Sequence, residues 1–144
     1  MQINVKTDAK RVELRLSDFR RNLRVLQPLW TTIRQRFIVA RIREIFDTDG
    51  FGTWPPTQRS NPILRDTRAL YRSYTSEGGN NINEVTPEEF IWGSDLDYAS
   101  IHEEGQGRIP PRPVIALLLD NESDNEVELI ADNWVSKLVR RFFF

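Results

Sequence analysis

Cysteine is absent from the 144-residue chain, and histidine occurs only once, at position 102. Without cysteine there is no disulfide framework, no thiol nucleophile and no thiolate metal site. A single histidine also excludes any site that needs two histidines from one chain. Long apolar runs are missing too, since the longest, Val114 to Leu119, falls far short of the ~20 residues that span a bilayer. We therefore expect no metal, no cofactor and no membrane partner.

Length and composition predict one soluble domain. A chain of 144 residues is typical of a single domain, and 39% hydrophobic with 28% charged residues is typical of a globular protein. We expect one domain over residues 1–144, with protruding loops in 50–62 and 76–113. The first 16 residues lack the apolar core of a signal peptide, which predicts a protein that stays in the cytoplasm of its cell.

The net charge of −1 hides a strong asymmetry between the two halves of the chain. Residues 1–76 carry 15 Lys and Arg against 7 Asp and Glu, whereas residues 77–144 carry 5 against 14. Arginine dominates the cations, with 17 Arg and 3 Lys, and arginine pairs well with carboxylates and phosphates. Three interpretations stay open: a nucleic-acid face balanced by an acidic tail, attraction between copies, or neutralisation within one subunit.

The N-terminal third predicts strands followed by helices. Alternating apolar residues predict strand segments at 2–6 and 12–16. A helix is expected from about Ser17 to Gln27, after which Pro28 kinks it or starts a new one. Two apolar stripes predict that the next helix lies between two partners, which are either two parts of one core or the chain's own sheet and a neighbouring subunit. The stripes comprise Leu29, Ile33, Phe37 and Ala40, and Ile38, Ile42, Ile45 and Phe46.

The remainder of the chain predicts a mixture of short elements. In order, we expect a helix over 63–74, strands at 72–75 and 90–93, a further piece of strand or loop at 83–85, a helical turn over 97–104, a Pro/Gly/Arg loop at 105–113, a strand or buried helix at 114–119, and an amphipathic helix that starts at a capping box in 123–126. At least one of the aromatics 142–144 should dock on the protein. This order predicts an α+β fold in which helices pack on a small, mostly antiparallel sheet.

No pattern in the sequence predicts an enzyme. His102 is followed by two glutamates but lacks the second histidine of a zinc-protease helix. The Asp47–Gly50 segment lacks the glutamate that closes a calcium loop, because Gln58 stands at that position. Neither a G-x-S-x-G nucleophile motif nor a phosphate-binding glycine loop is present. We expect no catalytic residues.

From residue 50 onward, a series of short motifs resembles one family. The segments are Gly52-Thr53-Trp54-Pro55-Pro56, Ile63-Leu64-Arg65-Asp66-Thr67-Arg68-Ala69-Leu70, Ile91-Trp92-Gly93-Ser94, Tyr98-Ala99-Ser100-Ile101-His102-Glu103-Glu104-Gly105 and Ile109-Pro110-Pro111-Arg112-Pro113. In this order they resemble the phage virion morphogenesis or tail completion family, which includes the gpG-like proteins of Mu-type phages. One departure is Arg68, which stands where the family usually has glycine.

The resemblance implies a structural virion protein of the phage tail and neck, assembled in the host cytoplasm. It implies a homo-oligomeric ring, commonly a hexamer, that caps the tail tube and joins tail to head. Its partners would be tail tube or sheath proteins and neck or connector proteins, with genomic DNA passing through the lumen without specific binding. The alternatives are a neck adaptor or stopper (head completion) protein and a small nucleic-acid-binding module.

These expectations nominate residues for contacts between subunits. Trp54 and Pro55 form a rigid apolar plug, unless Trp54 and Tyr98 simply fill the subunit's own core. Arg112, held on a stiff proline loop, suits a carboxylate of a neighbour. The full set of interface candidates is Trp54, Pro55, Tyr98, His102, Arg112, Pro113, Arg34, Arg36 and Phe144.

Overall fold

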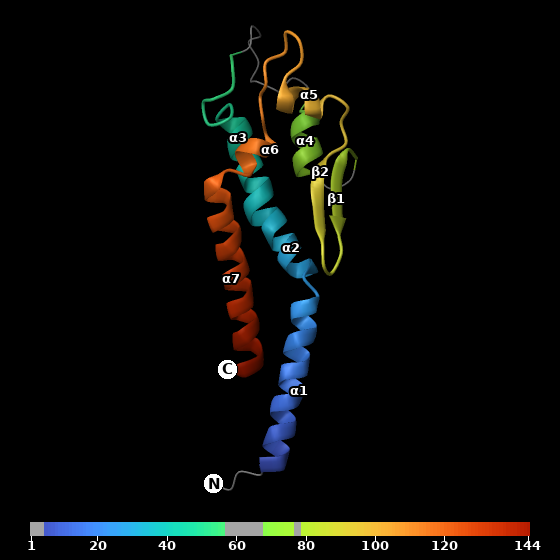
Figure 1. Cartoon of the computed structure of the whole chain (residues 1–144), viewed down its shortest axis with the longest axis vertical. Helices are drawn as coiled ribbons and strands as arrows, with labels where there is room; N and C mark the ends of the chain where they lie inside the picture. Colours follow the sequence, from blue (N-terminus) through green and yellow to red (C-terminus); the bar gives the residue numbers. More distant parts are fainter. Residues whose placement is uncertain (1–4, 57–67, 77–78) are drawn as a thin grey trace.

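A computed structural model describes residues 5–56, 68–76 and 79–144, with side chains omitted at 5–14, 121 and 122. The molecule is elongated, and it confirms the expected α+β class with an antiparallel hairpin among helices (Figure 1). In chain order the elements are α1 (Val5–Arg24), α2 (Gln27–Ile33), the π-helix η1 (Arg34–Val39), α3 (Ala40–Asp47), α4 (Ala69–Thr75), β1 (Asn81–Val85), β2 (Phe90–Ser94), α5 (Ala99–Glu104), α6 (Ile115–Leu118) and α7 (Asn121–Phe143).

The helical column α2–η1–α3 forms the centre of the core, and its buried residues repeat every four positions. One row is Leu29, Ile33, Phe37, Arg41 and Ile45, and the other is Arg34, Ile38, Ile42 and Phe46. A four-residue repeat drifts around an α-helix, which has about 3.6 residues per turn. The π-helical segment, with i→i+5 bonding, fits more residues into each turn and so keeps both rows facing the core.

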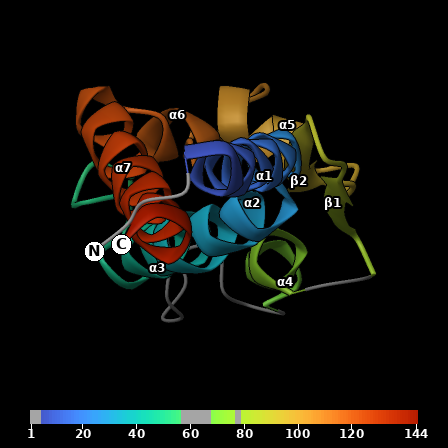
Figure 2. The ribbon, with the colours of Figure 1, turned by 90° about the horizontal axis from the view of Figure 1, so that it is seen from below.

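The column is packed from two directions, as its two apolar stripes predict. Helices α6 and α7 contact it on one side and α4 contacts it on another (Figure 2). Both stripes belong to one core, because the cluster of buried residues includes members of each. Of the two alternatives left open by the sequence, packing within a single subunit therefore accounts for the burial.

The hairpin of β1 and β2 packs on α4. Asn81 pairs with Ser94 and Val85 with Phe90 in antiparallel register. The ring of Trp92 lies 5.5 Å from that of Tyr74, and its Nε1 donates a hydrogen bond to the Tyr74 carbonyl at 3.0 Å. The hairpin confirms the strand expected at 90–93. Of the two alternatives for 83–85, strand or loop, the structure shows strand, as part of β1. It also shows that 76–113 contains regular elements between its loops.

Three expected strands are helical instead. Residues 5–6 and 12–16 lie in α1, while residues 1–4 are outside the described part of the chain. The alternation at these positions finds no strand to pair with, and the segment is rich in good helix formers. Residues 72–75 belong to α4, whose buried residues Leu70, Ser73 and Tyr74 follow helical spacing. The part of the expected helix at 63–67 lies outside the described residues.

The last helices differ in detail from the expected ones. The apolar run at 114–119 forms the short helix α6, and α5 confirms the helical turn expected within 97–104. The capping box expected at Ser123 is wrong by three residues. Asp120 occupies the cap position, since its Oδ1 accepts a hydrogen bond from the Ser123 N–H at 3.1 Å.

The aromatic end of α7 docks on α1. The ring of Phe19 lies 6.3 Å from that of Phe142 and 5.2 Å from that of Phe143, both edge to face. Phe144 is 96% exposed. The expectation that at least one of these aromatics docks is therefore confirmed. No helix within 5–56, 68–76 and 79–144 is both long and apolar enough to cross a membrane.

Candidate subunit interface

Trp54 belongs to the subunit's own core. Its side chain is 5% exposed, and its ring meets Phe46 edge to face at 5.4 Å. The indole Nε1 donates a hydrogen bond to the Pro113 carbonyl at 2.9 Å. The expectation of an apolar plug for a neighbour is thus corrected, because Trp54 is already enclosed by its own chain.

The turn before Trp54 shapes this packing. Asp49, Gly50 and Phe51 all have positive φ, at 53°, 67° and 55°. A Cβ on Gly50 would lie 2.4 Å from Cδ1 of the Trp54 ring, so only glycine leaves room for the indole. The backbone then closes through the Trp54 N–H, which donates to the Asp49 carbonyl at 3.1 Å.

Arg112 ties the two proline loops together. Its Nε donates to the Pro55 carbonyl at 3.0 Å and its Nη2 to the Pro56 carbonyl at 3.2 Å. Its backbone N–H donates to the His102 carbonyl at 2.7 Å. Because Arg112 is only 9% exposed, its guanidinium serves its own subunit, which corrects the expected pair with a neighbour's carboxylate.

Five interface candidates thus meet in one cluster, which we call the loop latch: Trp54, Pro55, His102, Arg112 and Pro113. His102 is half-buried in it, with the ring of Tyr98 at 5.9 Å. Burial, and then the neighbouring charge of Arg112, lower the pKa of His102 below its ordinary value. Its Nδ1 is buried without a hydrogen-bond partner in the described residues. Tyr98 keeps an exposed ring, and its place at an interface stays a prediction.

Glu103 performs a function that sequence reasoning missed. Its Oε2 accepts hydrogen bonds from the N–H groups of Val114 and Ile115 at 2.7 and 3.1 Å, and its Oε1 accepts from Ala116 at 2.8 Å. The carboxylate therefore satisfies the free donors at the start of α6. Burial, with the Glu103 charge as the smaller cause, raises the pKa of Tyr74 to about 12. No local pattern marks this cap, because it acts across 11 to 13 residues.

The two arginines nominated on the central column differ in exposure. Arg34 is buried, and its Nη2 donates to the Thr75 carbonyl at 3.1 Å, which corrects its place on a subunit interface. Arg36 is exposed and stays a prediction. Both residues belong to the π-helix η1, in which Arg34 faces the core and Arg36 faces outward.

Arg41 shows that part of the charge asymmetry is neutralised inside the subunit. Its Nη2 lies 2.5 Å from Asp120 Oδ2 and its Nη1 lies 3.3 Å from Glu126 Oε1. Its guanidinium also lies 5.4 Å from the centre of the Phe51 ring. This buried arginine joins the basic half of the sequence to the acidic half.

The described residues hold no group of three or more His, Asp or Glu side chains placed to bind a metal ion. Trp54 and Arg112 of the loop latch make structural contacts, with the backbone carbonyls of Pro55, Pro56, His102 and Pro113 as acceptors. Searches of protein-family models, curated proteins and solved structures each returned no match for this chain.

Proposed function

We propose that this protein is a structural subunit of a phage tail or neck, a tail completion or tail terminator protein that assembles into a ring, most simply a hexamer. It would cap the tail tube, contact tube or sheath proteins on one side and neck or connector proteins on the other, and let genomic DNA pass without specific binding. It would act in the virion and not as an enzyme.

The observation that carries the proposal concerns Arg68. This residue stands where the resembled family usually has glycine, and its φ is 55°, in the left-handed region that favours glycine. Glycine adopts this conformation readily, so the backbone at this position is compatible with the family's usual residue, although the side chain departs from it.

The loop latch gives further support. The motif around Trp54 lies more than 40 residues before those around His102 and Arg112, yet hydrogen bonds join Trp54 to Pro113, Arg112 to Pro55, and Arg112 to His102. Motifs that recur in a fixed order are expected to share a structural task when they are in contact. Here the task is to hold two proline loops and the start of α6 in one rigid unit.

The test is the molar mass of the purified protein by light scattering, over a wide concentration range and at low and high salt, followed by electron microscopy with isolated tail tubes. The proposal expects a discrete multimer near six subunits, or ring-shaped caps on tube ends. Arg36→Glu tests the exposed arginine of the central column, since rings that form unchanged would remove Arg36 from the interface. A monomer at every concentration that also ignores tail tubes would contradict the proposal.

Two other assignments make different predictions in the same experiments. A neck adaptor or stopper would bind connector proteins and leave tube ends bare. A nucleic-acid-binding module would retard duplex DNA with a steep dependence on salt. The acidic residues of α7 disfavour the second assignment, because a long duplex would meet them with repulsion.

A further inference from the structure

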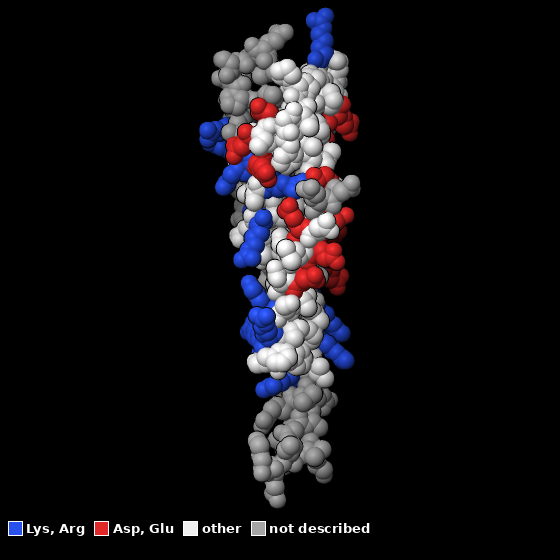
Figure 3. All heavy atoms as spheres, turned by 90° about the vertical axis from the view of Figure 1, so that its left-hand side faces the viewer, with Lys and Arg blue, Asp and Glu red and all other residues white. Residues whose placement is uncertain are grey.

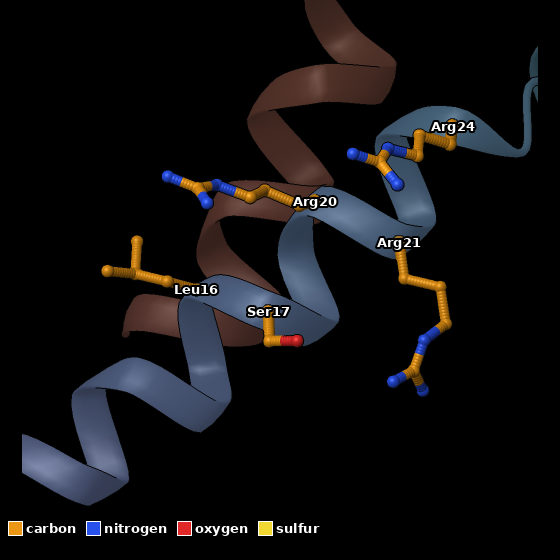
Figure 4. A pocket seen from close by; sticks show the side chains of 5 residues that line it. All are labelled: Leu16, Ser17, Arg20, Arg21 and Arg24. Atoms are coloured by element: carbon orange, nitrogen blue, oxygen red, sulfur yellow. The ribbon is translucent and has the colours of Figure 1, made fainter.

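Helix α1 presents an exposed face of mixed arginine and leucine. We call it the α1 face: Leu16, Arg20, Leu23 and Arg24. Figure 4 shows Leu16, Arg20 and Arg24 pointing to one side of the helix, whereas Arg21 points away from them. Together with Ser17 and Arg21, three of these residues line an open groove of about 520 Å³.

The charge on the α1 face is not neutralised within the described part of its own chain. Arg20 and Arg24 form no ion pair there, and the ion pair shown on α1 joins Arg21 to Asp18 at 3.5 Å. The docked end of α7 adds further cations nearby, among them Arg140 and Arg141 in its last turn. Like charges gathered in this way favour an anionic partner.

The middle of α7 presents a face of the opposite kind. We call it the α7 face: Glu128, Leu129, Asp132 and Val135, all exposed, with Leu129 at 61%. Figure 3 shows acidic residues gathered over the middle of this side of the molecule and basic residues toward its lower end. The α7 face thus combines an exposed leucine and valine with two carboxylates, and the α1 face combines two exposed leucines with two arginines.

We propose that the α7 face of one subunit docks on the α1 face of the next. Arg20 and Arg24 are four residues apart, as are Glu128 and Asp132, so both pairs span about 6 Å of helix. Leu16 and Leu23 are separated by about 10 Å of helix, and Leu129 and Val135 by about 9 Å. Two helices laid together can therefore match both charges and both apolar contacts at once.

Because the two faces are different surfaces of one chain, the contact is head to tail. Such contacts repeat from copy to copy and close into a ring or continue as a filament. The inference rests on the proposed ring assembly and names the surfaces that would form it. A duplex would satisfy the arginines but offers no apolar counterpart to Leu16 and Leu23, so a second copy is the better match.

The experiment uses charge reversal on each face of the full-length protein. One variant is R20E/R24E and the other is E128R/D132R. The control, R72E/R108E, changes the net charge by the same amount as the first variant but at Arg72, an exposed position of α4, and at Arg108 on an exposed loop. Thermal unfolding followed by circular dichroism checks that each variant is folded, and sedimentation velocity measures assembly.

We expect each reversed variant to lose assembly by at least about tenfold in dissociation constant, and an equimolar mixture of the two to restore it. The control should assemble like the wild type. If both reversed variants assemble as well as the wild type, the faces do not meet, while the proposed ring stands. If the wild type stays monomeric even with tail tubes, both proposals fall. A monomer that retards duplex DNA through Arg20 and Arg24 overturns the inference in favour of a nucleic-acid partner.

Discussion

The indole of Trp54 donates a hydrogen bond to the carbonyl of Pro113, 59 residues further along the chain. This bond joins the loop after α3 to the segment that leads into α6. Arg112 reinforces the same junction through the carbonyls of Pro55 and Pro56. The loop latch therefore joins residues that are far apart in the sequence through direct hydrogen bonds. We expect substitutions in it to lower the stability of the folded subunit.

Substitution of Trp54 separates packing from hydrogen bonding. Trp54→Phe retains much of the apolar contact with Phe46 but leaves the Pro113 carbonyl without its donor, so we expect a loss of about 1–3 kcal/mol in unfolding free energy. Trp54→Ala also opens a cavity and should cost about 3–5 kcal/mol. Urea unfolding followed by far-ultraviolet circular dichroism measures both. A Trp54→Phe variant as stable as the wild type would contradict a separate contribution from the hydrogen bond.

Gly50 offers a test of steric fit beside the same ring. Gly50→Ala places a Cβ in the space of the Trp54 indole and also strains a backbone with φ of 67°. Gly52→Ala is the matched control, since φ is 77° there but no atom lies within 4 Å of its Cβ position. We expect the control to lose about 1 kcal/mol from strain and Gly50→Ala to lose at least about 1–3 kcal/mol more from overpacking. Similar losses at both sites would show that the ring moves aside freely.

The fold class and the strongest periodic segments could be predicted from the sequence. Helix α7, the hairpin strand at 90–93 and the two-sided burial of the central column all follow from local patterns. The π-helix did not, although its signal is present: buried residues 33, 37, 41 and 45 repeat every four positions, a period that an undistorted α-helix does not keep on one face. A strict four-residue repeat of core positions is thus the sequence signal that predicts a π-helical segment here.

The sequence singled out several residues of the loop latch, but it did not predict what these residues contact. Proline-rich loops with Trp54 and Arg112 look exposed in sequence, because nothing local shows that their partners are carbonyl groups of the other loop. The same limit applies to Glu103 and Arg41, whose hydrogen-bond and ion-pair partners lie 11 or more residues away along the chain. The strands expected in α1 failed for a related reason, since an alternating segment forms a strand only where another strand pairs with it.

Arg41 should be a strong determinant of stability. Arg41→Met retains apolar bulk but leaves Asp120 and Glu126 without their shared cation, so we expect a loss of about 2–3 kcal/mol. Glu126→Gln removes the longer and more exposed pair and should cost less than about 1 kcal/mol. Chemical unfolding at low and high salt measures both effects. An unchanged unfolding free energy in Arg41→Met would indicate that the cost of burying the Arg41 charge cancels the gain from its ion pairs.

Stability should depend on pH through His102. Burial and Arg112 lower the pKa of His102 in the folded state, so below the ordinary value of about 6.5 the unfolded chain binds a proton that the folded chain resists. Stability is therefore full above that pH and falls as the pH drops toward the folded-state value. His102→Gln removes the titration, and we expect a smaller loss of unfolding free energy between about pH 7.5 and pH 5.5 in this variant. Identical losses in both proteins would assign the pH dependence to carboxylates.

Arg68 provides a test of both the backbone and the family resemblance. An arginine with φ of 55° is strained, whereas glycine adopts this conformation readily, so Arg68→Gly should be more stable than Arg68→Ala by about 1 kcal/mol. The comparison with alanine removes the arginine side chain from both variants and leaves the Cβ as the difference. Arg72→Gly, inside α4 on an exposed position, should instead lose about 1 kcal/mol, because glycine weakens a helix interior. Thermal unfolding of the three variants gives the order. If Arg68→Gly is no more stable than Arg68→Ala, the left-handed conformation at this position is wrong, and the proposed function loses the observation that carries it.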